Sequence, residues 1–506
     1  MKDCFTLTTE ANEFSYLADL LEDVCIAAID AIYEYQKRNS PPYIPTYYEY
    51  PENFFKGIEA NSDYIEAKKT LPVLKHNFPY YILSRFNTPP NYGELLRGTK
   101  GPYNIDCNTL PGFSKLLHSF TDNAPVHKVV TNNKGDIENL VISLLRNTVN
   151  RYLYVTKKFQ SGDIDNILLH SLIEKQLNRI YMKKLPVNIY IPVSFLEFGS
   201  DKIAITDTIS IIRMDNGFQT SRFLANRFNS AQESAAAQCA GFAIMISGCS
   251  LRNEENLSLS DAFSDYAQYP SQIETIINDL FAVIRIVQNA ETDYGQLLIE
   301  PDGWAEEWIT DLPPLYEVKI KTYKESTKIV DFLRYNIVSI NDESIDLIKK
   351  LYLEIQRQRE EATFRKVVIA LQRLNRCMLR NSDDDIALDA IIGIETLLSG
   401  DTRGEITYTI SNRISVIAAK LSACPYTPSE ARLALKKIYA FRSDIVHGRD
   451  LAKNRIIKIN GQELETKKLA VEFLRYSLLF LLCNPQYLEV RQFEIALDAS
   501  LSDKEN

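Results

Sequence analysis

The sequence lacks the features that mark secreted, membrane-spanning or metal-stabilised proteins. Its eight cysteines are scattered, with no C-x-x-C pair and no histidine at ligand spacing, so we expect reduced, mostly buried thiols and no metal site. The N-terminus has no apolar signal-peptide core, and the longest apolar runs, near residues 239–246 and 477–483, are too short to span a bilayer. These absences predict a cytoplasmic protein.

An excess of positive charge is also missing. The chain carries 57 Lys and Arg residues against 66 Asp and Glu residues, a net charge of -9. This balance argues against a general attraction to nucleic acid, so any contact with RNA or DNA requires a local basic patch. The turn at residues 98–103 contains two glycines but lacks the Gly-Lys-Ser/Thr ending that makes a phosphate-binding loop specific.

The 506 residues, with 45% hydrophobic content, are enough for two to four folded domains. We predict an α+β protein overall. A mainly helical, loop-rich region of unknown role occupies residues 1–184, and its size and position favour a sensing or inhibitory module. An α+β region with short strands follows at 185–329, then an all-α bundle at 330–490 and a C-terminal tail at 491–506.

Apolar periodicity gives the expected elements. Helices are predicted over residues 11–38, 136–159, 163–184, 273–289, 342–358, 364–380, 385–398, 406–421, 427–447 and 468–483. Strands are predicted over residues 187–198, 202–206 and 208–214, whereas 230–247 fits either a strand or a helix. Residues 41–55 are too rich in proline for a regular element, and turn-forming residues predict loops over 71–127.

The helix near the C-terminus is the strongest candidate for chemistry. Thr427 is a good N-cap, Pro428 suits the first helical position, and Glu430 completes a capping box. Gly448 supplies a left-handed stop at the other end. These signals predict where the helix begins and ends.

Arg442 and His447 lie on this helix in different predicted environments. Steps of about 100° per residue place Arg442 within an apolar arc that runs from Ala434 to Val446, where a charge needs a partner. His447 falls on the polar side, in the last turn, where the helix dipole favours a cation. Because imidazole exchanges protons near neutral pH, His447 is placed for proton transfer.

Glu395 projects from the apolar face of the helix predicted at 385–398, so we expect a buried carboxylate that needs a cation. Arg442 is one suitable partner. Arg413, on the following helix, is the other, and the sequence leaves both pairings open.

A basic stripe is predicted on the helix at 364–380. Its five cations, Arg365, Lys366, Arg373, Arg376 and Arg380, fall within an arc of roughly 100°. The stripe is either a solvated face or a surface that contacts phosphates. On the second interpretation, Arg365, Arg373 and Arg376 are candidates for RNA binding.

The pair of Arg442 and His447 suits metal-free cleavage of a phosphodiester, with His transferring protons and Arg stabilising charge on phosphorus. RNA supplies its own nucleophile, the 2′-OH, so neither a metal nor a cofactor is needed. One His and one Arg are too few for both proton transfers, and a symmetric dimer would double them at one composite site. The structural alternative is that Arg442 pairs with Glu395 inside the bundle and His447 merely ends a helix.

Four segments resemble, in order, successive signatures of the Apea-like HEPN family. They cover residues 370–375, 385–398, 404–413 and 439–448. The R-x4-6-H motif of the family maps onto Arg442 and His447, and its helix acid maps onto Glu395. Ser443 stands where many HEPN nucleases carry Asn, Asp or His, so Ser443 and its neighbour Asp444 are supporting candidates.

The resemblance covers about residues 185–485 and implies a HEPN helical bundle that forms a homodimer or a higher even oligomer. It further implies a metal-independent endoribonuclease that cleaves RNA, with tRNA as one candidate, and that acts as the toxic effector of anti-phage defence after a phage-derived trigger. Residues 1–184 lie outside the resemblance. The alternative is a non-catalytic HEPN dimerisation scaffold or a nucleotide-binding regulator. Membrane action is disfavoured because no long apolar segment is present.

Overall fold

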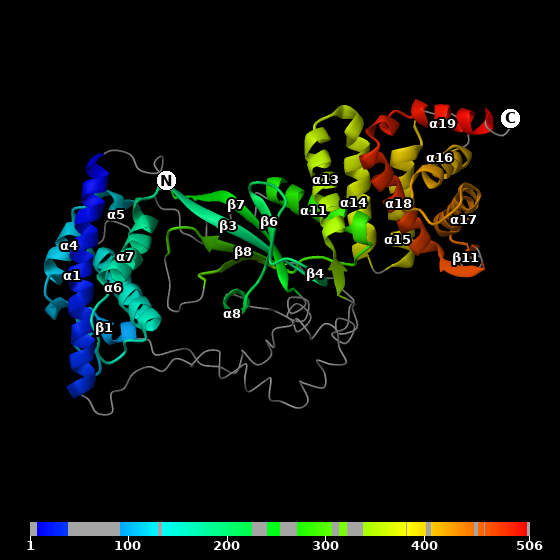
Figure 1. Cartoon of the computed structure of the whole chain (residues 1–506). Coiled ribbons are helices and arrows are strands. Elements are labelled where there is room, and N and C mark those ends of the chain that lie inside the picture. The colour runs from blue at the N-terminus through cyan, green and yellow to red at the C-terminus, as the bar shows by residue number, and fades with distance from the viewer. Residues whose placement is uncertain are drawn as a thin grey trace, which may run out of the picture.

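A computed structural model defines the architecture of the chain (Figure 1). It describes residues 8–38, 92–129, 134–224, 240–253, 271–305, 313–320, 337–380, 382–400, 406–449, 454–459 and 461–502. An N-terminal helical unit, a central sheet and a C-terminal helical bundle follow one another along the molecule. The α+β class is confirmed. The loops expected at 41–55 and 71–91 lie outside the described residues.

The N-terminal unit is a set of helices around its own hydrophobic core. Its helices are α1 (Thr8–Arg38), α4 (Phe113–Thr121), α5 (Ala124–Val129), α6 (Lys134–Thr156) and α7 (Asn166–Tyr181), with a short parallel pair, β1 (Leu96–Arg97) and β2 (Ile105–Asp106). The prediction of loops up to residue 127 is wrong for α4 and α5. Phe113, Leu116 and Phe120 are buried and recur at helical spacing. This pattern has only three members, and the turn-forming residues on either side of it favoured the prediction of a loop.

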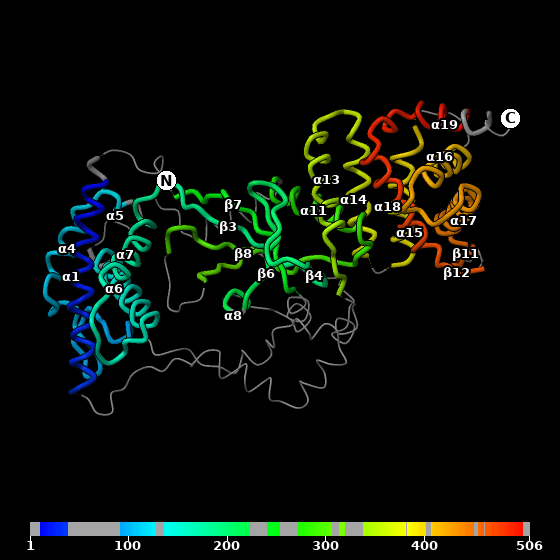
Figure 2. The backbone as a smooth tube through the Cα atoms, in the orientation of Figure 1, coloured from blue at the N-terminus to red at the C-terminus, as the bar shows by residue number. Residues whose placement is uncertain are grey.

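The central sheet, as described, has six antiparallel strands in the order β5-β6-β7-β3-β8-β9. Figure 2 shows β3 between β7 and β8. The strands are β3 (Lys184–Val193), β5 (Lys202–Ala204), β6 (Ile209–Arg213), β7 (Phe242–Arg252), β8 (Gln296–Pro301) and β9 (Tyr316–Ile320). Alternate residues of β3 face opposite sides. Ile189 and Ile191 join the core shared with the bundle, whereas Tyr190 packs with Phe218 of α8 (Asn216–Leu224) on the other face. Residues 242–247 of the ambiguous segment are therefore strand.

The C-terminal bundle continues the same core. Its helices are α11 (Ser271–Gln288), α13 (Asp342–Gln358), α14 (Arg365–Leu379), α15 (Asp383–Leu398), α16 (Ile406–Lys420), α17 (Pro428–Val446), α18 (Thr466–Cys483) and α19 (Arg491–Ser502). A parallel pair, β4 (Leu196–Phe198) and β10 (Val338–Ile340), joins the sheet region to the chain entering α13, and the hairpin β11 (Ile456–Ile459) and β12 (Gln462–Glu465) separates α17 from α18. Sheet and bundle share one hydrophobic cluster.

The end of the chain differs from the expected tail. Residues 491–502 form α19, whose Phe493 is buried with its ring centroid 5.0 Å from that of Tyr487. Phe493 also lies near Phe480 of α18. The prediction of a tail at 491–506 is therefore wrong for residues 491–502, because a single aromatic anchor in a polar segment gives too little periodicity to predict a packed helix.

Candidate functional site

The ends of α17 form as the sequence predicts. The Thr427 hydroxyl accepts a hydrogen bond from Glu430 N, and the Glu430 carboxylate accepts one from Thr427 N at 2.9 Å, which completes the capping box. At the other end, Gly448 has φ +61°. Gly448 N donates to Ile445 O at 3.2 Å and Arg449 N donates to Asp444 O at 2.8 Å, the two bonds of a Schellman motif. The helix therefore stops at His447, its C-cap residue.

The last turn of α17 is more exposed than its apolar arc predicts. Leu435, Ile438 and Phe441 are buried, but Val446 is 57% exposed and Arg442 is 38% exposed. The prediction that Arg442 lies in the middle of a buried face is therefore wrong. Apolar periodicity marks a buried face only where a packing partner runs along the whole helix, whereas the last turn of α17 extends past the core. His447 is exposed there, beside the exposed Gly448.

Glu395 of α15 faces Arg442. Its Oε1 atom lies 3.7 Å from Arg442 Nε, and its side chain is 24% exposed, so it is partly rather than fully buried. Arg442 Nε is buried without a hydrogen-bond partner. The side chain as a whole is nevertheless 38% exposed, and Nη1 and Nη2 are not among the buried atoms that lack a partner. Arg442 thus has a buried Nε beside Glu395 on a side chain that is partly open to solvent.

Arg413, the rival partner of Glu395, has a different role. It is buried, and its Nη1 atom donates to the carbonyl oxygens of Leu398 at 2.5 Å and Ser399 at 2.9 Å. Its Nη2 atom lies 3.3 Å from the Glu494 carboxylate. Arg413 therefore satisfies the carbonyl groups at the C-terminal end of α15, where a cation is favoured. The two open pairings resolve to Arg442 with Glu395 and Arg413 with Glu494.

Tyr439, which the sequence did not mark as a site residue, also lies beside Glu395. Its hydroxyl is buried and makes no hydrogen bond of regular geometry. Burial, the charge of Glu395 and a weak hydrogen bond to that carboxylate raise the pKa of Tyr439. The available signal was spacing, because Tyr439 lies three residues before Arg442 and such residues share a helix face.

The supporting candidates on α17 have structural contacts. Asp444 Oδ2 accepts a hydrogen bond of 2.6 Å from Asn454 Nδ2, which ties the last turn of α17 to the chain entering β11. Ser443 is half-buried, and its carbonyl oxygen accepts the His447 backbone N–H at 3.0 Å. Within the described residues, no hydrogen bond or ion pair joins the side chains of Arg442 and His447. The two are separate groups, five residues apart, near the C-terminal end of α17.

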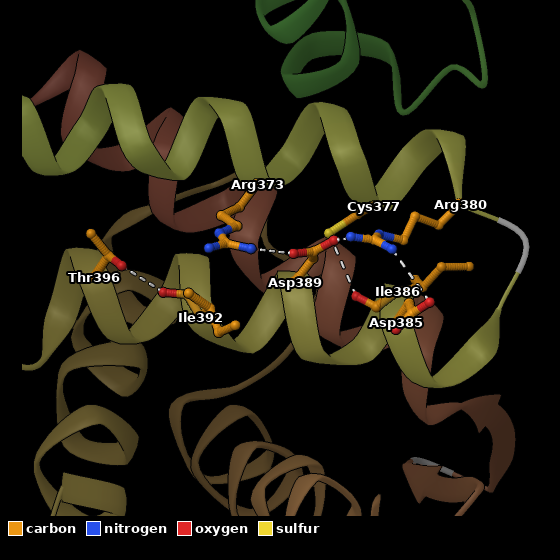
Figure 3. A network of polar contacts seen from close by, with 8 residues as sticks. All are labelled: Arg373, Cys377, Arg380, Asp385, Ile386, Asp389, Ile392 and Thr396. Carbon is orange, nitrogen blue, oxygen red and sulfur yellow. Dashed lines mark hydrogen bonds and ion pairs between the residues drawn. The ribbon is translucent and has the colours of Figure 1, made fainter. Parts of the chain in front are cut away.

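The basic stripe of α14 is largely engaged within the bundle (Figure 3). Asp389 of α15 is 5% exposed and accepts hydrogen bonds from Arg373 Nη1 at 2.5 Å and Arg380 Nε at 2.7 Å. Their charges are thus offset by a buried carboxylate, which disfavours the prediction that Arg373 contacts RNA. Arg365 and Arg376 are exposed and keep that possibility. Asp389 was missed because sequence alone does not show which residues face each other across two helices.

Other features of the bundle lie apart from Arg442 and His447. Among the described residues, no group of three or more His, Cys, Asp or Glu side chains is arranged to hold a metal ion. Cys377 is buried, and burial raises its pKa. A cavity of about 350 Å³ opens beside it, with Arg380, Lys467 and Lys468 among its lining residues. Lys467 and Lys468 each pair with a nearby carboxylate. Neither Arg442 nor His447 lines this cavity.

The comparisons with known proteins add no relative. The chain matches no protein-family model, no curated protein and no solved structure. Within the part of the chain that the structure describes, no helix is both long and apolar enough to cross a membrane. The resemblance to Apea-like HEPN proteins therefore stays a prediction that rests on the four quoted segments.

Proposed function

We propose that this chain is a metal-independent endoribonuclease of the HEPN type, in which Arg442 and His447 act on the phosphodiester of RNA. The observation that carries the proposal is the C-terminal end of α17, which presents an exposed imidazole at the C-cap and, more than one turn earlier, an arginine side chain that is 38% exposed. A cation that can bind phosphate and a group that exchanges protons near neutrality are the two requirements of the reaction.

The proposed reaction is an internal transfer within RNA. One His447 takes the proton of the 2′-OH, whose oxygen attacks phosphorus, and the P–O5′ bond breaks as the leaving oxygen gains a proton. The products are a 2′,3′-cyclic phosphate and a 5′-OH end. Arg442 offsets the negative charge that grows on the phosphorane oxygens. The second proton comes from His447 of a partner copy, so the proposal includes a homodimer or a higher even oligomer.

The biological context is part of the proposal. RNA is the substrate, with tRNA as one candidate. The chain serves as a toxic effector in anti-phage defence, with the N-terminal helical unit responding to a phage-derived trigger. A cytoplasmic location, without membrane action, goes with this role.

A specific observation favours the alternative, a non-catalytic dimerisation scaffold or nucleotide-binding regulator. Arg373 and Arg380 of α14 are engaged by Asp389, so that part of the bundle offers little free positive charge to a polyanion. On this alternative, Arg442 serves only as the partner of Glu395 and His447 only ends α17.

The two candidates separate in one experiment. Purified protein is incubated with total RNA in the presence of a chelator, with and without lysate from phage-infected cells, and the ends of the products are analysed. We expect cleavage to 2′,3′-cyclic phosphate ends by the wild type and none by His447→Ala. His118→Ala is the matched control because His118 is an exposed histidine in the last turn of another helix, α4. Equal cleavage by the His447 variant, or none by the wild type under either condition, contradicts the nuclease.

A further inference from the structure

Tyr439 and Arg442 meet the same carboxylate from one face of α17. Arg442 Nε lies 3.7 Å from Glu395 Oε1, and the Tyr439 hydroxyl has Glu395 as its charged neighbour. Both donor atoms are buried, and neither makes a hydrogen bond of regular geometry. One partly buried carboxylate therefore lies beside two buried donors, and neither donor is fully hydrogen-bonded.

The two incompletely bonded donors favour a closer approach of Tyr439 and Arg442 to the Glu395 carboxylate. A buried donor without a full hydrogen bond is unfavourable, so the site gains when the carboxylate and its two donors approach each other. An anion at the Nη1 and Nη2 end of Arg442 would fix the guanidinium plane and leave Nε–H directed at Glu395. Contacts at functional sites are often long in the free protein and tighten in the complex.

The protonation of Tyr439 suits this arrangement. Burial, followed by the charge of Glu395, raises the pKa of the phenol, so the hydroxyl keeps its proton at neutral pH and stays a donor. The ring itself is half-buried in the bundle core, which limits its rotation. The neutral hydroxyl can therefore donate a hydrogen bond to the Glu395 carboxylate, whereas a phenolate would repel it.

We propose that Tyr439 is a positioning residue of the site. Its hydroxyl holds the Glu395 carboxylate against Arg442 Nε, so that Nη1 and Nη2 point to solvent and bind a phosphate group. The inference rests on the proposed function, in which Arg442 takes the phosphate of RNA. Tyr439 itself makes no contact with RNA. Loss of its hydroxyl weakens phosphate binding although Arg442 is still present.

The first test separates kcat from KM. Tyr439→Phe removes the hydroxyl and keeps the ring, and Tyr426→Phe is the matched control because Tyr426 donates to Glu472 at 3.0 Å elsewhere in the bundle. With an RNA oligonucleotide and no metal, we expect Tyr439→Phe to raise KM about tenfold, the size of one hydrogen bond to a charged group. The pH profile of kcat keeps its shape because His447 is untouched. Tyr426→Phe leaves both constants unchanged.

The second test does not depend on cleavage. Inorganic phosphate is titrated into full-length protein labelled with ¹⁵N-arginine, and the Nε resonance of Arg442 is followed after assignment with Arg442→Lys. We expect a saturable shift in the wild type, and about tenfold more phosphate is needed in Tyr439→Phe and in Glu395→Gln. If the wild type binds phosphate at Arg442 but cleaves no RNA, the proposed nuclease activity is refuted. Weaker phosphate binding by Tyr439→Phe then still supports the positioning role.

Three outcomes overturn the positioning role. The first is a folded Tyr439→Phe protein with the KM and phosphate affinity of the wild type. The second is a Tyr439→Phe protein with a lower melting temperature but with unchanged KM and unchanged phosphate affinity. In that case the hydroxyl only stabilises the fold. The third is a wild type in which phosphate leaves the Arg442 resonance unmoved, which also removes phosphate binding from the proposed function.

Discussion

Gly393 on α15 is the position where an added methyl group should disturb the bundle most clearly. A Cβ atom there would lie 2.8 Å and 2.9 Å from the two δ carbons of Leu474, which is fully buried on α18. Carbon atoms pack at about 3.5–4.0 Å, so either the Leu474 side chain, which the surrounding core confines, or one of the two helices has to shift. Overpacking of this kind costs about 1–3 kcal/mol.

The intrinsic preference of the helix acts in the opposite direction. Alanine in the middle of a helix is more favourable than glycine by about 1 kcal/mol. For Gly393→Ala the two effects leave a net loss of about 1 kcal/mol in the free energy of unfolding. In a Leu474→Ala background the clash is gone, and the same substitution should stabilise the protein by about 1 kcal/mol. The effect of one methyl group therefore changes sign with its neighbour.

Urea unfolding followed by circular dichroism measures all four proteins of this cycle. Leu474→Ala alone should lose about 2–5 kcal/mol, because it leaves a cavity in the core. If Gly393→Ala stabilises the wild type, the close approach of α15 and α18 is wrong. If it destabilises both backgrounds equally, the cost does not come from Leu474.

The remaining predictions concern charged and polar side chains around the site. His447→Ala should abolish RNA cleavage and change the free energy of unfolding by less than about 0.5 kcal/mol, because the side chain is exposed; a larger loss on thermal melting contradicts this. Arg442→Ala should cost less than about 1 kcal/mol, because the pair with Glu395 is partly exposed; a loss above about 3 kcal/mol would indicate the buried pair that the sequence predicts. Asp389→Asn should lower the free energy of unfolding in urea by about 2–3 kcal/mol. This is less than for a fully buried pair because both arginines reach solvent. A variant as stable as the wild type refutes the pairing of Asp389 with Arg373 and Arg380. A hydrogen bond from Lys467 lowers the pKa of Asp383, so its stabilising effect is present above the ordinary carboxyl pKa and is lost as the pH falls through the folded value. The stability difference between wild type and Asp383→Asn, measured by urea unfolding from pH 7 to pH 2, should therefore shrink in acid; a constant difference counts against the pair.

Local signals predicted the elements of this chain well. The capping box and Gly448 fixed both ends of α17, and the helix at 342–358 begins and ends where its periodicity does. Such signals act within one turn of chain, so they survive in any tertiary context. The prediction failed at 113–129 and 491–502, where short helices are held by a few buried apolar residues. Whether such a segment is helical depends on its packing against elements that are distant in the sequence. Local sequence patterns do not show that packing.

Charge pairing shows the same limit at the candidate site. Arg413 and Arg442 each looked suited to Glu395, while Arg373 was a candidate for RNA binding, and the positions of these residues in the sequence do not show which acid each one meets. The crossing of the helices assigns Asp389 to Arg373 and Glu395 to Arg442, while Arg413 reaches the end of α15. An ion pair needs its atoms within about 4 Å, a tolerance smaller than one helical turn. Small differences in helix crossing therefore decide which cation is neutralised and which, like Arg442, keeps a side open to solvent.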